Sequence, residues 1–293
     1  MLRGLLHGYR TVFHPDAVWR RTADGVRAIG HTGSMSEEIV LLSVEDTVAT
    51  VTLNHPATRN ALSLELMRAL IDTFRALGER TDVHAIVLAA AGHVFSSGHD
   101  LKEVGCAEHP EQQEIFETCS ELMLLIQEIP QPVIARVQGV ATAAGCQLVA
   151  TCDLAVASSE ARFGTPGVRI GLFCSTPMVA LSRAVDRKTA LRMLLTGDML
   201  SAEEALARGL VSDVAAPGEL EDAAAALAAR VAQASSATVA IGKRAFYEQI
   251  HLSTSDAYSR MSRVMADNAV MPDAREGIDA FLTKREPQWR GRS

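Results

Sequence analysis

Two short turns built from small residues are the features of this sequence that point most directly to chemistry. One lies within Phe95–Glu103 and the other within Ala141–Leu148, and each follows an apolar segment. Ser, Gly and Ala leave the backbone N–H groups of such turns open to a ligand, whereas bulkier side chains would cover them. Two open turns could hold one oxyanion between them. Fixed donors of this kind stabilise the charge that moves onto a thioester oxygen in an enolate or tetrahedral transition state.

Other kinds of active site find little support in the sequence. Ser96, Ser97, His99 and Asp100 lie too close together along one turn to form a catalytic triad, and no G-x-S-x-G elbow occurs. There is no P-loop and no G-x-G-x-x-G motif. His93 and His99 have no further ligand set behind them, so we expect no metal site.

Composition limits the classes of partner. A chain of 293 residues with 48% hydrophobic content can form one large domain, or a domain with an appendage. The net charge of −7 argues against a nucleic-acid surface, and no apolar run reaches the ~18 residues of a membrane span. Five cysteines without a C-x-x-C pair suggest neither a disulfide framework nor a zinc site, so we expect a reducing, cytoplasmic setting.

Residues 1–34 differ from the rest of the chain, because they contain five arginines and only two acidic residues. An arginine-rich, acid-poor leader can be a transit peptide, which would place the protein in the mitochondrial matrix. The alternative is a disordered or misassigned extension with the real start at Met35.

Hydrophobic periodicity predicts the elements that position the two turns. We expect a hairpin over 39–53, a helix capped by Ser63, and a buried strand over 84–90 that leads into the first turn. A helix over 111–129 and a strand over 133–137 lead to the second turn. A helix that begins at Ala144 would offer free N–H groups and a dipole that favours negative charge. Further segments are predicted as strands over 154–157 and 162–163 and as helices over 220–233, 238–250, 255–270 and 273–284.

Three segments, Asn54–Ser63, Phe95–Glu103 and Gly139–Asp153, resemble the signature segments of the crotonase (enoyl-CoA hydratase/isomerase) superfamily. The resemblance runs from about Ile39 to about Trp289. It implies an α/β fold, a crotonase-like spiral of ββα units with a C-terminal helical trimerisation region, in place of the doubly wound sheet that alternating strands and helices suggest. We therefore expect an extension over 1–34, a core over 35–235 and a helical oligomerisation region over 236–293, in a homotrimer or a dimer of trimers.

The resemblance also implies roles for particular residues. The oxyanion donors would be the backbone N–H groups of His99 and Ala144. The two catalytic glutamates of hydratases correspond to Gln147 and Gly167, and neither can accept a proton at neutral pH. Standard two-glutamate hydration is therefore not expected, and Gln147 would orient water or substrate.

The sequence leaves two alternative roles open for each of two further side chains, Cys174 and His99. Cys174 lies where some superfamily members place another catalytic acid. It would act as a nucleophile only with a stabilised thiolate, and otherwise packs as a small buried thiol. The imidazole of His99 could titrate near neutral pH, but we favour a wall role in which its backbone N–H contributes the chemistry.

The coenzyme A part of a substrate would contact a separate set of residues. By resemblance, Arg59 and Lys102 lie near the nucleotide phosphates, Ala61 contacts adenine through its backbone, and Lys284 belongs to a segment that covers the nucleotide in the oligomer. Exposed Arg and Lys are otherwise solvated surface. We expect an acyl-CoA-binding, enoyl-CoA hydratase-like enzyme that uses no separate cofactor. The alternatives are a non-catalytic CoA-ester-binding or oligomeric interaction protein, and an acyl-CoA thioesterase that uses Cys174.

Overall fold

The computed structural model describes residues 19–22, 25–28 and 38–292. The chain divides into two compact units, Met1–Glu37 and Glu38–Ser293. In the first, strand β1 (Trp19–Thr22) pairs antiparallel with β2 (Gly25–Ala28). The rest of the expected leader and the alternative start at Met35 lie outside the described residues.

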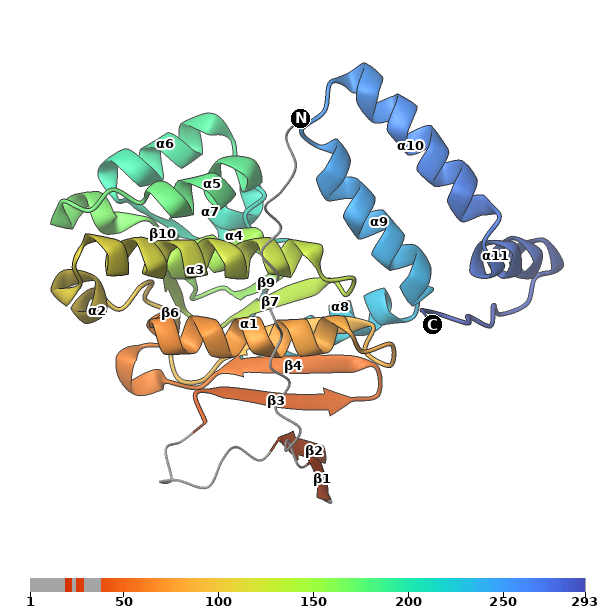
Figure 1. Cartoon of the computed structure of the whole chain (residues 1–293), viewed down its shortest axis with the longest axis horizontal. Helices are drawn as coiled ribbons and strands as arrows, with labels where there is room; N and C mark the ends of the chain where they lie inside the picture. Colours follow the sequence, from red (N-terminus) through yellow and green to blue (C-terminus); the bar gives the residue numbers. More distant parts are fainter. Residues whose placement is uncertain (1–18, 23–24, 29–37, 293) are drawn as a thin grey trace, which may run out of the picture. The chain divides into compact units, whose positions relative to one another are not determined.

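The larger unit contains two sheets, and from β5 to β10 successive strands of the chain belong alternately to one sheet and the other (Figure 1). The order of the larger sheet is β12-β9-β7-β5-β4-β3, and that of the smaller sheet is β11-β10-β8-β6. The larger sheet comprises β3 (Val40–Glu45), β4 (Val48–Leu53), β5 (Ala85–Ala90), β7 (Val133–Val137), β9 (Leu154–Ser158) and β12 (Asp213–Ala215). The smaller sheet comprises β6 (Val94–Ser96), β8 (Val140–Thr142), β10 (Arg162–Gly164) and β11 (Met199–Ser201).

Each turn of the chain adds one strand to each sheet and then forms helix. Thus β5 and β6 precede α2 and α3, β7 and β8 precede α4, and β9 and β10 precede η2 and α5. The strands β5, β7 and β9 are parallel neighbours, as are β6, β8 and β10. This topology confirms the predicted spiral of ββα units. The helical segments are η1 (Pro56–Thr58), α1 (Leu64–Gly78), α2 (Leu101–Cys106), α3 (His109–Glu128), α4 (Ala144–Thr151), η2 (Pro166–Ile170), α5 (Ser175–Ala184), α6 (Arg187–Thr196), α7 (Ala202–Ala207), η3 (Pro217–Glu219), α8 (Leu220–Ala232), α9 (Ser236–Gln249), α10 (Thr254–Ala269) and α11 (Pro272–Thr283).

The core lies on both faces of the larger sheet. Its central strands are almost continuously apolar, as expected for parallel strands covered on both sides. Helix α8 covers one face with Leu220, Ala224 and Ala228, while the main cluster, which includes the apolar stripe of α1, covers the other. Ser63 caps α1 by accepting a hydrogen bond from the N–H of Leu66, as the sequence predicted.

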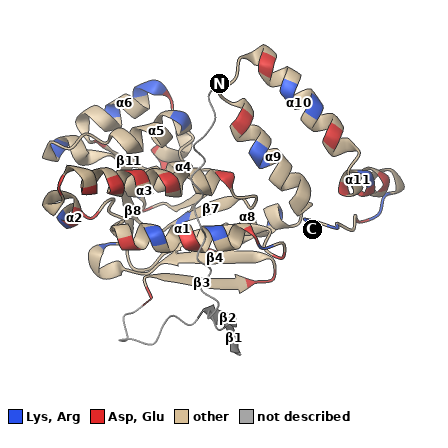
Figure 2. Ribbon diagram, in the orientation of Figure 1, with Lys and Arg blue, Asp and Glu red and all other residues tan. Residues whose placement is uncertain are grey.

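Surface ion pairs join α1 to α3. Figure 2 shows basic segments on α1 and acidic segments on α3. Arg68 pairs with Glu114, and Arg75 pairs with Glu121. All four side chains are at least half exposed, so each pair contributes no more than about 1 kcal/mol. The apolar packing beneath them therefore fixes how the two helices lie.

Helices α9, α10 and α11 extend from the edge of the sheets as an arm (Figure 1). The three predicted C-terminal helices are confirmed, and they belong to the same compact unit as the sheets. Within the described residues no single helix is long and apolar enough to cross a bilayer. The helical segments Pro217–Ala232 and Ser236–Gln249 are together long and apolar enough, but the chain bends by 100° between them.

A buried ion pair anchors the first helix of the arm. The ammonium group of Lys243 in α9 lies 2.7 Å from Asp153 Oδ2 and donates to the carbonyl oxygens of Ile126 and Gln131. Asp153 also accepts hydrogen bonds from the N–H of Val133 and from the Tyr247 hydroxyl. Burial lowers the pKa of Lys243, and the neighbouring Asp153 carboxylate opposes that shift.

We predict that Lys243→Met lowers the free energy of unfolding by about 3–5 kcal/mol, because it leaves the Asp153 carboxylate buried without its cation. Urea denaturation followed by circular dichroism measures this loss. The matched control is Lys188→Met, which makes the same chemical change at an exposed position and should stay within about 0.5 kcal/mol of the wild type. Equal effects of the two substitutions would contradict the anchoring role.

Candidate functional site

The three segments that follow β6, β8 and β10 meet at one edge of the smaller sheet. Because β6, β8 and β10 are parallel neighbours, the segments that follow them leave the sheet at the same end. These segments contain Gly98 and His99, Ala143 and Ala144, and Thr165–Gly167. The topology therefore brings together three of the positions predicted from sequence, which are His99, Ala144 and Gly167.

The first turn leaves the N–H group of His99 free. Leu62 pairs with His99 in an isolated parallel bridge, in which Leu62 donates to the Gly98 carbonyl at 2.8 Å and accepts from the Asp100 N–H at 3.4 Å. In such a bridge the N–H of the paired residue points away from the neighbouring segment. Within residues 38–292 the His99 N–H has no hydrogen-bond partner.

The second turn contains a strained residue. Ala143 has φ 50° and ψ −119°, a conformation that L-residues rarely adopt, and its N–H donates to the Gly164 carbonyl at 2.9 Å. Ala144 follows as the first residue of α4, where the helix dipole favours negative charge. Its N–H also has no partner among the described residues. We call the N–H groups of His99 and Ala144 the amide pair.

Glycines let the two turns touch. A Cβ atom on Gly98 would lie 2.8 Å from Ala143 Cβ and 3.2 Å from the Ala144 nitrogen, and Gly98 has φ +91°. A Cβ atom on Gly145 would lie only 2.4 Å from the Ser96 carbonyl oxygen. Since no other residue fits at these two positions without displacing backbone, glycine sets the close approach of the amide pair.

The two positions of the expected glutamates differ in how much space they offer. Gln147 in α4 is 4% exposed, and its side-chain oxygen lies 3.9 Å from the Cys119 sulfur, a weak contact. At Gly167 a Cβ atom would lie 2.2 Å from the Leu172 carbonyl oxygen and 2.8 Å from the Cys174 sulfur. A side chain at 167 would therefore displace the turn that carries Leu172 and Cys174.

The buried thiols and the imidazole near the two turns are neutral at neutral pH. Burial raises the pKa of Cys174, and it raises those of Cys119 and Cys146 to about 12. Burial also lowers the pKa of His99 to about 4. The neutral Cys174 thiol, which packs against Gly167, favours the packing alternative over the nucleophile. The His99 ring is neutral, and its buried Nε2 has no hydrogen-bond partner among the described residues, so the ring fits a wall better than a base.

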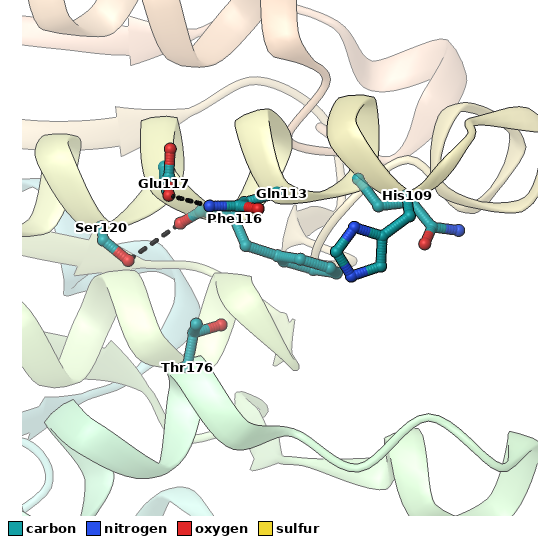
Figure 3. A pocket seen from close by; sticks show the side chains of 7 residues that line it. His109, Gln113, Phe116, Glu117, Ser120 and Thr176 are labelled. Carbon is teal, nitrogen blue, oxygen red and sulfur yellow. Dashed lines mark hydrogen bonds between the residues drawn. The ribbon is translucent and has the colours of Figure 1, made fainter.

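A cavity of about 410 Å³ lies between α3 and the first turn of α5 (Figure 3). The ring of Phe116 lines it and meets the His99 ring edge-on, with centroids 5.2 Å apart. Glu117 is the carboxylate of the lining, and it accepts a hydrogen bond from Gln113. The lining residues are His109, Gln112, Gln113, Phe116, Glu117, Ser120 and Thr176.

The residues expected to contact coenzyme A fall into two groups. Arg59 and Ala61 lie in the segment beside the first turn. The Arg59 carbonyl accepts a hydrogen bond from the Ser97 N–H, and Leu62, which follows Ala61, pairs with His99. Lys102 follows that turn in α2, and both cationic side chains are exposed. Lys284 ends α11 in a left-handed conformation, and in Figure 1 α11 lies far from α2. A single chain therefore does not bring Lys284 to the other three.

Sequence reasoning missed several residues that build the site. Asn60 is fully buried at φ 51°, and its side chain accepts from the His55 N–H and donates to the carbonyl oxygens of Ala91 and Val94. Asparagine is enriched in left-handed turns, which was the available signal. Phe116 gave no signal beyond helical periodicity. Within the described residues no group of three His, Cys, Asp or Glu side chains could hold a metal ion.

The lowered pKa of His99 predicts a pH dependence of stability. The unfolded chain binds a proton near pH 6.5 and the folded protein only near pH 4, so stability falls as the pH falls through this window, by up to about 3 kcal/mol. We predict that His99→Gln removes this part of the loss when urea unfolding is compared at pH 7 and pH 4. His251→Gln, at an exposed position, is the control. An unchanged pH dependence in His99→Gln would show that the imidazole is not held neutral.

Comparison with known proteins gives consistent matches. The model of the enoyl-CoA hydratase/isomerase family matches residues 43–292. The rat (Rattus norvegicus) mitochondrial enoyl-CoA hydratase domain-containing protein 3 is 49% identical over 84% of this chain and 82% of its own length. The crystal structure of an enoyl-CoA hydratase from Mycobacterium smegmatis has a TM-score of 0.85 and 48% identity, covering 86% of this chain and 99% of that chain. That of human enoyl-CoA hydratase domain-containing protein 3 has a TM-score of 0.84 and 46% identity, covering 86% of this chain and 100% of that chain.

Proposed function

Because this chain belongs to the enoyl-CoA hydratase/isomerase family, we propose that it is an acyl-CoA-binding, hydratase-like enzyme whose amide pair polarises the thioester carbonyl. One observation carries the proposal: two neighbouring N–H groups have no partners in the described chain, and the ring of His99, which supplies one of them, contacts Phe116 in the wall of a cavity of about 410 Å³. Donors fixed in place in this way stabilise negative charge on a carbonyl oxygen without reorganising during the reaction.

Proton transfer in this enzyme would differ from that of a two-glutamate hydratase. Gln147 can orient a water or the substrate through hydrogen bonds but cannot take up a proton. Gly167 supplies no side chain, and the Leu172 carbonyl occupies the space where one would begin. The Glu117 carboxylate in the cavity lining is a further candidate proton acceptor, and it accepts a hydrogen bond from Gln113.

A non-catalytic CoA-ester-binding protein is the second candidate. It is favoured by the neutral state of Cys174, Cys119 and His99 beside the amide pair, since general acid–base catalysis needs a group whose pKa lies near the working pH. A thioesterase that uses Cys174 is the third candidate. The raised pKa of this thiol weighs against it, because the thiolate is the nucleophile.

Coenzyme A would lie along the segment beside the first turn. Arg59 and Lys102 would bind its phosphates and the Ala61 backbone its adenine, and the exposure of both cations and their place beside the first turn support this assignment. Lys284 would come from another copy of the chain, because α11 lies far from α2 in one chain (Figure 1). Coenzyme A enters as part of the substrate, and no separate cofactor is proposed.

Binding and turnover of crotonyl-CoA and a panel of longer enoyl-CoAs test the proposal. We expect isothermal titration calorimetry to detect binding. We expect loss of the enoyl absorbance to report slow hydration. Gln147→Ala should slow turnover if Gln147 orients the water, and Glu117→Gln asks whether the cavity carboxylate accepts the proton. Tight binding without turnover above the uncatalysed rate would favour the second candidate. Absence of binding would reject the acyl-CoA assignment altogether.

We predict that Gln147→Glu accelerates hydration of crotonyl-CoA about 100-fold, because it adds a carboxylate beside the amide pair. The rate should rise with pH, since burial raises the pKa of a carboxyl group and the ionised form is the base. Gln147→Met, which fills similar space without hydrogen-bonding capacity, is the matched control. No gain in Gln147→Glu would mean that residue 147 does not face the reacting carbons.

We propose that the chain assembles as a homotrimer or a dimer of trimers through its arm. Large apolar side chains on α10 and α11 are exposed, among them Tyr258, Met265, Phe281 and Leu282, and Phe281 is 83% exposed. Exposed apolar surface on this scale marks interaction sites. Light scattering should give three or six times the chain mass, and Phe281→Asp should reduce it. A monomer would contradict the assembly.

For location we propose the mitochondrial matrix in place of the cytoplasm expected from composition. The name of the rat relative places that protein in mitochondria, and the arginine-rich residues 1–34 are consistent with a transit peptide.

A further inference from the structure

We propose that Thr142 is a positioning residue for the amide pair, which its hydroxyl holds at a fixed separation. The Thr142 hydroxyl donates a hydrogen bond to the Ser97 carbonyl oxygen at 3.1 Å. Thr142 lies two residues before Ala144, and Ser97 lies two residues before His99. The bond therefore joins equivalent points of the two turns. This inference rests on the proposed function, since it concerns the same two donors.

The ladder between β6 and β8 stops short of the amide pair, although Thr142 still pairs with Gly164 of β10. The pairing of β6 with β8 ends at Ser96 and Ala141, after a register shift between Val94 and Ser96. Beyond that pair, the Thr142 bond is the one hydrogen bond within residues 38–292 that joins 97–99 to 142–144. The Thr142 hydroxyl thus adds a hydrogen bond between the two turns to the strand pairing and the glycine contacts that bring them together.

Each turn has its own attachments on its outer side. The Ser97 N–H donates to the Arg59 carbonyl at 3.1 Å, and the Gly98 carbonyl accepts from Leu62. On the other turn, the Ala143 N–H donates to the Gly164 carbonyl. Loss of the Thr142 hydroxyl would leave these outer bonds in place, so each turn would keep its own shape while the gap between the turns could widen.

The contact at Gly98 sets the smallest distance between the two turns, and the Thr142 hydrogen bond limits the largest. The space at Gly98 is already filled by Ala143 Cβ and the Ala144 nitrogen, so the turns cannot approach further. The Thr142 hydroxyl prevents them from separating. The unfavourable backbone of Ala143 aims the Ala144 N–H, and a strained conformation persists only where its surroundings hold it. Two hydrogen bonds hold Ala143 in this conformation: that of the Thr142 hydroxyl to Ser97 and that of the Ala143 N–H to the Gly164 carbonyl.

The test compares the wild type with Thr142→Val, which keeps the β-branched shape and removes the hydroxyl, and with Thr142→Ser, which keeps the hydroxyl. The probe is butyryl-CoA labelled with ¹³C at the thioester carbonyl, which has no double bond to hydrate. Difference infrared spectroscopy reads the polarisation of the bound carbonyl as a shift to lower frequency. Titration gives the affinity of each variant for the same probe.

We expect the carbonyl of the bound probe to shift in the wild type and in Thr142→Ser. In Thr142→Val the shift should fall by about half or more and the band should broaden, because one donor is misplaced. Affinity should change by less than about tenfold, since contacts to the coenzyme A moiety remain. In any variant that turns over enoyl-CoA, the effect should fall on kcat more than on KM.

Two outcomes separate failure of this inference from failure of the proposed function. A wild-type protein that binds the probe without a carbonyl shift, or does not bind it, rejects the oxyanion role of the amide pair. A wild-type shift that Thr142→Val retains in full rejects the positioning role of Thr142 alone. Should Thr142→Val not fold, Thr142→Ser and Thr142→Ala differ by one oxygen atom, and equal shifts in these two variants would overturn the inference in the same way.

Discussion

The parallel pairing of β6, β8 and β10 is the constraint on which the candidate site depends. It forces three successive turns to leave one edge of the smaller sheet together, and Gly98 and Gly145 let the first two of them touch. Backbone N–H groups that would ordinarily be consumed by a ladder or a helix are left free at that edge. The donors therefore follow from the path of the main chain, whatever side chains surround them.

Charge stabilisation and proton transfer are thereby assigned to different parts of the molecule. The amide pair belongs to the backbone and persists as long as the turns remain in contact. The groups that would move protons are side chains, and here they are Gln147, a glycine at 167, and buried thiols and an imidazole that stay neutral. Under the proposed function, the backbone would bind and polarise a thioester, and the side chains would determine the acid–base chemistry.

Much of the fold could be predicted from sequence, because local patterns specify it. The hairpin over 39–53, the Ser63 cap and the helices of the arm follow from alternation, capping and helical periodicity, and the small residues at 96–98 and 141–145 predicted open amides. The spiral of ββα units came from family resemblance, since periodicity alone suggests a doubly wound sheet.

Other features depend on partners distant in the chain. The Asn60 side chain donates hydrogen bonds to two carbonyl oxygens more than thirty positions away, and Lys243 donates to a carbonyl 117 positions earlier. No local pattern distinguishes such residues from solvated polar side chains. The strained backbone of Ala143 is equally invisible in the sequence, because alanine ordinarily signals nothing of the kind.

The Asp153 carboxylate has a consequence for how the molecule unfolds. It holds the start of β7 through Val133, and it holds α9 through Lys243 and Tyr247. Detaching the arm would strand a carboxylate and an ammonium group in an apolar interior, which is strongly unfavourable. Sheets and arm should therefore melt in one cooperative transition, and a fragment that ends near residue 235 would lack a piece of its own interior.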